Sequence, residues 1–265
     1  MKNRLIAIII LFFIVNGVLL AQFNEPEFIY RVKTMYHSLK LTGLDNFSSW
    51  VTSNIFLEAT KEFSSEELYP LEIIWKNPNL IYYIRRPLPQ PSDTLKQNEI
   101  RELQMDMIQE LQGLLIDWQR FSAGNILDDL PETHLVTTKE DTVIIEYEKF
   151  EGGKNVKVKM LFGQNGLCLK ITTNYAQNNE IIHIYPEYIL VEEKWICNKW
   201  MLQVYKNGQV ESGFMVSLKS RKLEDFWVPQ RLILQLQKRG IDNTMFMRDY
   251  KFRNVVLNKD VQIMK

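Results

Sequence analysis

The sequence predicts an α+β fold, in which an antiparallel β-sheet is accompanied by amphipathic helices. Three observations carry this prediction. Apolar residues recur at helical spacing after Glu25, and they do so again over residues 93–123. From Thr142 onward, apolar and polar residues alternate in short runs that are separated by tight turns. Such alternation is typical of an antiparallel sheet that exposes one side to solvent.

Residues 1–21 have the layout of a secretory signal peptide. Two positive charges, Lys2 and Arg4, precede an apolar run that ends at Ala21. The run is shorter than the ~20 residues that span a bilayer, although an uncleaved membrane anchor is the alternative. We expect cleavage near Ala21, so that Gln22 becomes the N terminus of a soluble exported protein. No cysteine lies near Ala21 to carry an N-terminal lipid.

The charge balance argues against a nucleic-acid-binding protein. The chain has 32 basic and 32 acidic residues, and removal of the predicted signal peptide takes away two basic ones. Electrostatic binding to nucleic acid needs an excess of basic residues, and the sequence has no basic stripe. With 46% hydrophobic and 12% aromatic residues, residues 22–265 can bury one core. We therefore expect a single domain and a monomer.

The first elements after the signal peptide are predicted to be a helix and a strand. Pro26 suits the first turn of a helix that begins at Glu25 and ends at Gly43. Residues 47–59 then carry apolar side chains among Ser, Thr and Asn, which favours a first strand.

Residues 71–87 predict a hairpin of two core strands, around which we expect the other strands to be arranged. The apolar runs on either side are rich in β-branched and aromatic residues. Asn77, Pro78 and Asn79 separate them, and proline is disfavoured inside a strand because it cannot donate a backbone hydrogen bond.

A long helix is predicted over residues 93–123. The proline-rich segment 87–91 precedes it, Ser92 or Asp93 can cap its first turn, and Gly124 ends it. Its apolar stripe is consistent with core packing, with a ligand-facing role, or with both. The stripe consists of Leu95, Leu103, Met107, Leu111, Leu114, Trp118 and Phe121.

The rest of the chain reads as a meander of antiparallel strands. Turn residues at 151–154, 164–166 and Asn207-Gly208 join neighbouring runs, and a further turn is expected around Gly240. The predicted strands cover residues 143–148, 156–162, 167–173, 181–185, 188–191, 195–205, 214–218, 227–236 and 245–252.

Cys168 and Cys197 are the two cysteines of the chain, and both lie in apolar runs. Two alternatives are open for them: one disulfide bond in an oxidising compartment, or two buried thiols. Their separation excludes a CxxC redox or zinc motif.

We predict that the protein is not an enzyme and that it has no catalytic residues, no metal site and no cofactor. The sequence lacks the HExxH, GxSxG, P-loop and GxGxxG motifs. His37, His134 and His183 are widely separated, and the paired acidic residues are typical of solvated loops.

Two stretches of the chain resemble the LolA-like family of periplasmic lipoprotein carriers. The first is the order Trp75, Lys76, Pro78, Asn79 and Leu80, which continues into an aromatic run that closes on Pro87. The second is the proline-led strand after Trp227 together with the final phrase FRNVVLN, residues 252–258. The resemblance implies a curved, incompletely closed antiparallel sheet, or half-barrel, with amphipathic helices that cover its open side.

The chain departs from that family pattern at two places. Asn77 stands where the carriers usually have a basic residue before the proline of the corner. Residues 93–123 form a helical insertion where the carriers have a hairpin with an Asp-Gly turn. A LolA-like relative of unknown cargo is therefore favoured over a dedicated lipoprotein carrier.

The resemblance implies a periplasmic protein that holds lipid or lipoprotein acyl chains in a cavity between the sheet and a helical lid. Burial of an acyl chain yields about 0.8 kcal/mol per CH₂, so no charged clamp is needed for affinity. A role in outer-membrane lipoprotein trafficking would add membrane-bound donor or acceptor proteins as partners. The alternative is a non-catalytic envelope sensor or protein-interaction module of the same fold. The candidate lining residues, from the hairpin and the long helix, are Trp75, Tyr82, Ile84, Leu111, Leu115 and Trp118.

Overall fold

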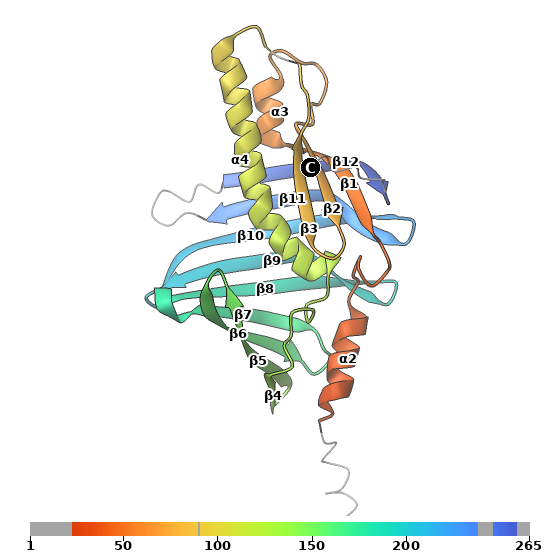
Figure 1. The fold of residues 1–265 in the computed structure, drawn as a ribbon, viewed down its shortest axis with the longest axis vertical. Coiled ribbons are helices and arrows are strands. Elements are labelled where there is room, and N and C mark those ends of the chain that lie inside the picture. Colours follow the sequence, from red (N-terminus) through yellow and green to blue (C-terminus); the bar gives the residue numbers. More distant parts are fainter. Residues whose placement is uncertain (1–22, 90, 238–245, 259–265) are drawn as a thin grey trace, which may run out of the picture.

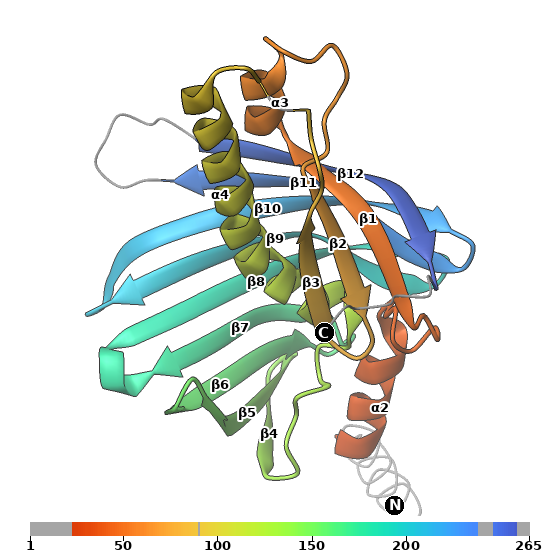
Figure 2. The ribbon, with the colours of Figure 1, turned by 45° about the horizontal axis from the view of Figure 1, so that its top comes forward.

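The chain folds into one large antiparallel sheet that is accompanied by few helices (Figures 1 and 2). The structure is a computed structural model that describes residues 23–89, 91–237 and 246–258. The predicted signal peptide and the predicted turn at Gly240 lie outside the described residues. The sheet has 12 strands and is not closed into a barrel, because its two edge strands are not paired with each other. The predicted antiparallel, incompletely closed sheet is confirmed, whereas the helices that were predicted to cover its open side are a minor part of the fold.

The helical elements are α2 (Glu25–Met35), α3 (Asn54–Thr60), α4 (Thr94–Trp118), the π-helical turn η1 (Gln119–Ala123) and the 3₁₀ turn η2 (Ala176–Asn178). The strands are β1 (Asn46–Ser53), β2 (Leu71–Lys76), β3 (Leu80–Arg85), β4 (His134–Lys139), β5 (Thr142–Glu151), β6 (Lys154–Gly163), β7 (Cys168–Tyr175), β8 (Glu180–Val191), β9 (Lys194–Lys206), β10 (Gln209–Leu223), β11 (Phe226–Gln237) and β12 (Phe246–Leu257).

The strand order combines a long meander with three strands from the other end of the chain. Strands β4 to β12 pair with their neighbours in sequence, and β1 then pairs with β12, so that Val51 lies opposite Phe252. Strands β2 and β3 follow β1 and complete the sheet. The predicted hairpin of β2 and β3 is therefore confirmed, but it lies at one edge of the sheet and not at its centre.

Two sequence-based boundaries and two strand assignments were wrong. Helix α2 ends at Met35 and not at Gly43, because Tyr36 forms a bridge to Trp195 and the His37 amide donates to the Trp195 carbonyl over 2.9 Å. The predicted strand 47–59 is interrupted by α3, whose first turn is capped by the Ser53 hydroxyl. Strand β4 was not predicted at all, and the predicted strands 181–185 and 188–191 form one continuous strand, β8.

Helix α4 and η1 cover the residues for which the sequence predicts a long helix. Asp93 caps the first turn, since its carboxylate accepts from the Leu95 amide over 2.8 Å. Figure 2 shows α4 crossing one side of the sheet, which we call the helix side; the opposite side is the outer side. Trp118 packs edge-on against Phe47 and Trp75, with ring centroids 5.8 and 6.4 Å away.

Polar contacts fix the middle of α4 to β12 and to the edge strand β3. The Tyr250 hydroxyl of β12 donates to the Glu110 carboxylate, which also accepts from Arg248 Nε over 3.2 Å. On β3, the Tyr83 hydroxyl donates to the Leu111 carbonyl over 3.4 Å. The helix is therefore held as part of the core in this structure.

Truncation of the buried face of α4 should destabilise the whole domain. Leu111 is fully buried, whereas Ile116 on the same helix is 59% exposed. We expect Leu111→Ala to lower the free energy of unfolding by about 3 kcal/mol through lost burial and an unfilled cavity. The matched control, Ile116→Ala, should change it by less than about 0.5 kcal/mol. Urea unfolding measures both, and equal losses would contradict the packing of α4.

His37 is a buried histidine whose surroundings favour the uncharged ring. It is 5% exposed, and its Nε2 accepts from the Trp227 amide over 3.4 Å. Burial, assisted by the charge of Lys194, lowers the pKa of His37 to about 4. The imidazole is therefore neutral in the folded chain at pH values where it would be protonated in the unfolded chain.

Acid should therefore destabilise the protein through His37. Below its ordinary pKa of 6.5, His37 binds a proton in the unfolded state, whereas in the folded state it binds one only near pH 4. The stability of the folded state therefore falls as the pH falls from 6.5 toward 4. We expect the His37 contribution to drop by about 2 kcal/mol between pH 7 and pH 5. The comparison is urea unfolding of the wild type and His37→Asn at both pH values. Parallel losses in the two proteins would refute this role.

Candidate functional site

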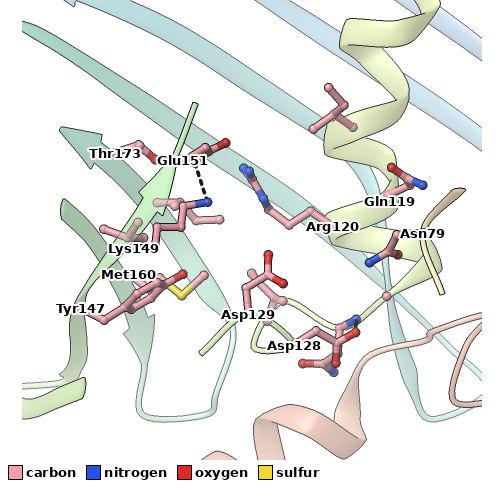
Figure 3. A pocket seen from close by; sticks show the side chains of 16 residues that line it. Asn79, Gln119, Arg120, Asp128, Asp129, Tyr147, Lys149, Glu151, Met160 and Thr173 are labelled. Atoms are coloured by element: carbon pink, nitrogen blue, oxygen red, sulfur yellow. Dashed lines mark hydrogen bonds and ion pairs between the residues drawn. The ribbon is translucent and has the colours of Figure 1, made fainter. Parts of the chain in front are cut away.

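A cleft of about 190 Å³ lies where the end of α4 meets strands β5, β6 and β7 (Figure 3). Its walls come from four parts of the chain. They are the corner between β2 and β3, the α4–η1 junction, the segment 124–129, and the helix side of the three strands. The cleft therefore lies between β3, at one edge of the open sheet, and strands β5 to β7 near the other edge.

The floor of the cleft is apolar. Val158 and Met160 of β6 and Ile171 of β7 are at most 4% exposed, and Ile126 adds to them from the segment after η1. Val158 and Met160 alternate along β6 with the exposed Lys157 and Lys159, so the floor continues the apolar side of the sheet. Such a floor suits the apolar part of a ligand.

The rim of the cleft carries charges of both signs. Arg120 extends from η1 toward the strands, and Lys149 and Glu151 of β5 form an ion pair of 2.7 Å (Figure 3). Asp129 faces the cleft from the segment after η1. A ligand whose polar end both donates and accepts hydrogen bonds would find partners on this rim.

Burial favours the neutral form of two ionisable groups at or beside the cleft, Asp117 and Tyr147. Burial raises the pKa of Asp117, and Arg120, whose Nη1 is 3.3 Å from the carboxylate, opposes this shift. Burial also raises the pKa of Tyr147 to about 12. The Tyr147 hydroxyl therefore keeps its proton at neutral pH and is available as a donor.

The segment after η1 is fixed by Asp128. Its carboxylate accepts from the Asn125 amide over 3.0 Å and forms an ion pair of 3.1 Å with Lys40. A side chain at Gly124 would bring its Cβ to 3.0 Å from the same carboxylate, so glycine leaves room for this contact. The wall of the cleft is consequently tied to the segment that follows α2.

Gln119 supplies an unsatisfied donor beside the cleft. Its Nε2 is buried and makes no hydrogen bond within the described residues, and the residue lines the cleft near Asn79 (Figure 3). A buried amide nitrogen without a partner loses the hydrogen bonds it would make in water. It also lies in a π-helical turn, an irregularity that often accompanies functional sites.

The candidate lining residues from the sequence lie elsewhere. Trp75, Leu111, Leu115 and Trp118 are at most 1% exposed and pack against one another in the core. Tyr82 and Ile84 alternate along β3 with Tyr83, which contacts α4, so they point to the outer side. None of the six lines the cleft, whereas Ile116, Gln119 and Arg120 next to them on the chain do. Arg120, a charged residue between Trp118 and Phe121 of the apolar stripe, was the sequence feature that could have indicated the cleft.

Cys168 and Cys197 are free thiols, and both are at most 1% exposed. Of the two alternatives from the sequence, the structure has the pair of buried thiols. They lie beside the buried Tyr36, whose hydroxyl accepts from the Cys168 amide over 2.7 Å. Burial raises the pKa of Cys168 to about 12, so its reactive thiolate form is scarce.

A thiol-specific reagent should therefore fail to modify the folded protein. We expect both cysteines to react only after denaturation. The denatured chain should then react with two equivalents of the reagent without a reductant. Absorbance of the released chromophore gives the count. A denatured chain that reacts only after reduction would have a disulfide instead, and fast labelling of the native chain would contradict the burial of both side chains.

Within the described residues there is no group of three or more His, Cys, Asp or Glu side chains that could hold a metal ion. None of the helices described here is both long enough and apolar enough to cross a membrane.

No protein-family model, curated protein or solved structure matches the chain.

Proposed function

We propose that this chain is a non-catalytic binding protein that holds the apolar part of an amphipathic ligand, such as a lipid acyl chain, beside helix α4. The cleft at the α4–η1 junction is the entrance in this proposal. The ligand's polar end lies near Arg120 and Lys149, and its apolar part lies on the floor of Val158, Met160 and Ile171. The observation that carries the proposal is the combination of an apolar floor with a rim of both charge signs.

Two further features support binding over catalysis. The residues that line the cleft include no serine, cysteine or histidine. The charged rim residues Lys149 and Asp128 are committed to ion pairs with Glu151 and Lys40, and the Tyr147 hydroxyl is held protonated. These groups can anchor a ligand by hydrogen bonds, but a poised nucleophile and its base are not among them.

The size of the cleft indicates a ligand that is only partly enclosed. Pockets that enclose small molecules usually have about 300–1,000 Å³. The cleft of about 190 Å³ is smaller, so a long acyl chain enters fully only if α4 moves away from the sheet. The proline-rich segment 87–91 and Gly124 lie at the two ends of the helical segment, where such a movement would hinge.

We extend the proposal to the LolA-like half-barrel family and to an exported, periplasmic protein. An open antiparallel sheet with a helix across one side has the outline that the resemblance implies. In that setting, lipoprotein acyl chains are the cargo and membrane-bound donor or acceptor proteins are the partners of a monomeric carrier. The signal-peptide pattern of residues 1–21 supports export.

The second candidate is an envelope sensor or protein-interaction module of the same fold. The tightly filled contact between α4 and the sheet favours it, because Leu111, Leu115 and Trp118 leave no cavity for cargo in this state. In this role the cleft is a minor surface feature, and α4 is a permanent part of the core.

A charge at the cleft entrance should weaken binding of a fluorescent fatty acid to the delipidated protein. Ile116 is 59% exposed and lines the cleft, whereas Leu95 on the same helix is 78% exposed and does not. We expect Ile116→Asp to weaken binding roughly tenfold, because about two buried methylenes lose their apolar contact. The matched control Leu95→Asp should bind as the wild type does.

Native mass spectrometry of the purified protein complements this titration by showing whether a lipid is carried along. Equal affinities for the two variants would remove the cleft as the binding site. Failure of the wild type to bind any acyl chain, together with a lipid-free mass, would leave the interaction module as the function.

A further inference from the structure

The outer side of the sheet has a hollow of about 490 Å³ over β10, β11 and β12 that is lined mainly by cations. Tyr250 contacts α4, so its neighbour Lys251 points to the outer side, and Arg231 and Lys219 lie opposite it on the next two strands. The basic residues that line the hollow are Lys219, Arg221, Arg231, Lys251 and Arg253.

The cross-strand pairing in this hollow brings like charges together. Lys219 lies directly opposite Arg231, which lies directly opposite Lys251. Like charges in directly opposite positions destabilise a sheet. At the far end of the same outer side the pairing is complementary, because Lys159 and Lys157 of β6 face glutamates of β5 at 3.0 and 3.3 Å. The cationic row is therefore local to β10–β12.

Nearby carboxylates neutralise only part of this charge. Asp249 accepts two hydrogen bonds from Arg231, of 2.8 and 2.6 Å. Glu67 forms ion pairs with Lys251 at 2.7 Å and with Arg253 at 3.1 Å. Five cations against two carboxylates leave an excess of three positive charges.

Lys219 and Arg221 account for most of the unmatched charge. Neither forms an ion pair with any described residue, and Arg221 Nε is buried without a hydrogen-bond partner. A buried guanidinium nitrogen without an acceptor is costly unless a ligand supplies one. Guanidinium and ammonium groups in this arrangement match the oxygens of a phosphate group.

Apolar side chains flank the cationic hollow on the same side of the sheet. Trp50 of β1 lies opposite Arg253 and is covered by Arg86, whose guanidinium carbon is 3.5 Å from the centre of the ring. On β3, Leu80 and Ile84 point to the outer side and are 51% and 45% exposed. Exposed apolar residues beside a basic patch are typical of surfaces that lie at a membrane interface.

We propose that the outer side of β10–β12 and β1–β3 docks on a membrane surface that carries anionic phosphate headgroups. The headgroup phosphates contact Lys219 and Arg221 in the hollow, while Leu80 and Ile84 enter the headgroup layer. Charge complementarity selects the anionic surface, and the apolar residues favour a lipid layer over a soluble phosphate compound. The side used for docking is opposite to α4, so the helix and its cleft stay accessible.

The test is co-sedimentation of the full chain with phosphatidylglycerol vesicles and, separately, with phosphatidylcholine vesicles. The double variant Lys219→Gln/Arg221→Gln should bind phosphatidylglycerol roughly 25-fold more weakly, because each basic residue contributes about fivefold near an anionic surface. The matched control Lys157→Gln/Lys159→Gln also removes two positive charges, on the outer side of β6, and should bind as the wild type does. Circular dichroism verifies the fold of each variant. The single variant Lys219→Gln, at an exposed position, should bind phosphatidylglycerol vesicles about fivefold more weakly than the wild type.

Three results would overturn the proposal. The first is equal binding of the wild type to both kinds of vesicle. The second is an equal loss in the double variant and in its control, which would reflect net charge and not this hollow. The third is binding of inorganic phosphate or of duplex DNA without any binding to vesicles.

Discussion

The contact between α4 and the helix side of the sheet is the constraint on which the rest of the structure depends. A sheet of 12 strands that does not close leaves a broad apolar side, which must be covered to be stable in water. The edge-on packing of Trp118 against Phe47 and Trp75 joins the helix to β1 and β2, and the Glu110–Tyr250 hydrogen bond holds it to the neighbouring strand β12. The turn η1 continues this cover, since Phe121 packs against Trp200 of β9, and the cleft lies beside it at Gln119 and Arg120.

Much of the fold could be predicted from local sequence patterns, because periodicity and turn residues act over a few neighbouring positions. The boundaries of α4, the hairpin at Asn77-Pro78-Asn79 and the turn at Asn207-Gly208 follow from such patterns. The pairing of β1 with β12 could not be predicted, because it joins residues about 200 positions apart. The end of α2 at Met35 was missed for the same reason, since its cause is the distant Trp195.

The candidate site was predicted less well than the fold. An apolar stripe shows which face of a helix is buried, but it does not show whether the space opposite is filled. Leu111, Leu115 and Trp118 were assigned correctly to the apolar face, and that face is filled by the sheet. Tyr82 and Ile84 point to the outer side because Tyr83, between them, points to α4. The contact of Tyr83 with α4 is a tertiary one, which the local sequence does not show. The cleft draws on four separate segments, and no single stretch of sequence contains it.

The open sheet has a mechanical consequence for the cleft. In a closed barrel, continuous hydrogen bonding fixes the circumference, so the width of the interior is set by the number and tilt of the strands. Here β3 and β4 are the two edge strands, and no backbone hydrogen bonds pair them with each other. Asn79 next to β3 and Tyr147 of β5 line opposite ends of the cleft, with Arg120 and the segment 124–129 between them. A small change in sheet twist can therefore widen or narrow the cleft without breaking any backbone hydrogen bond.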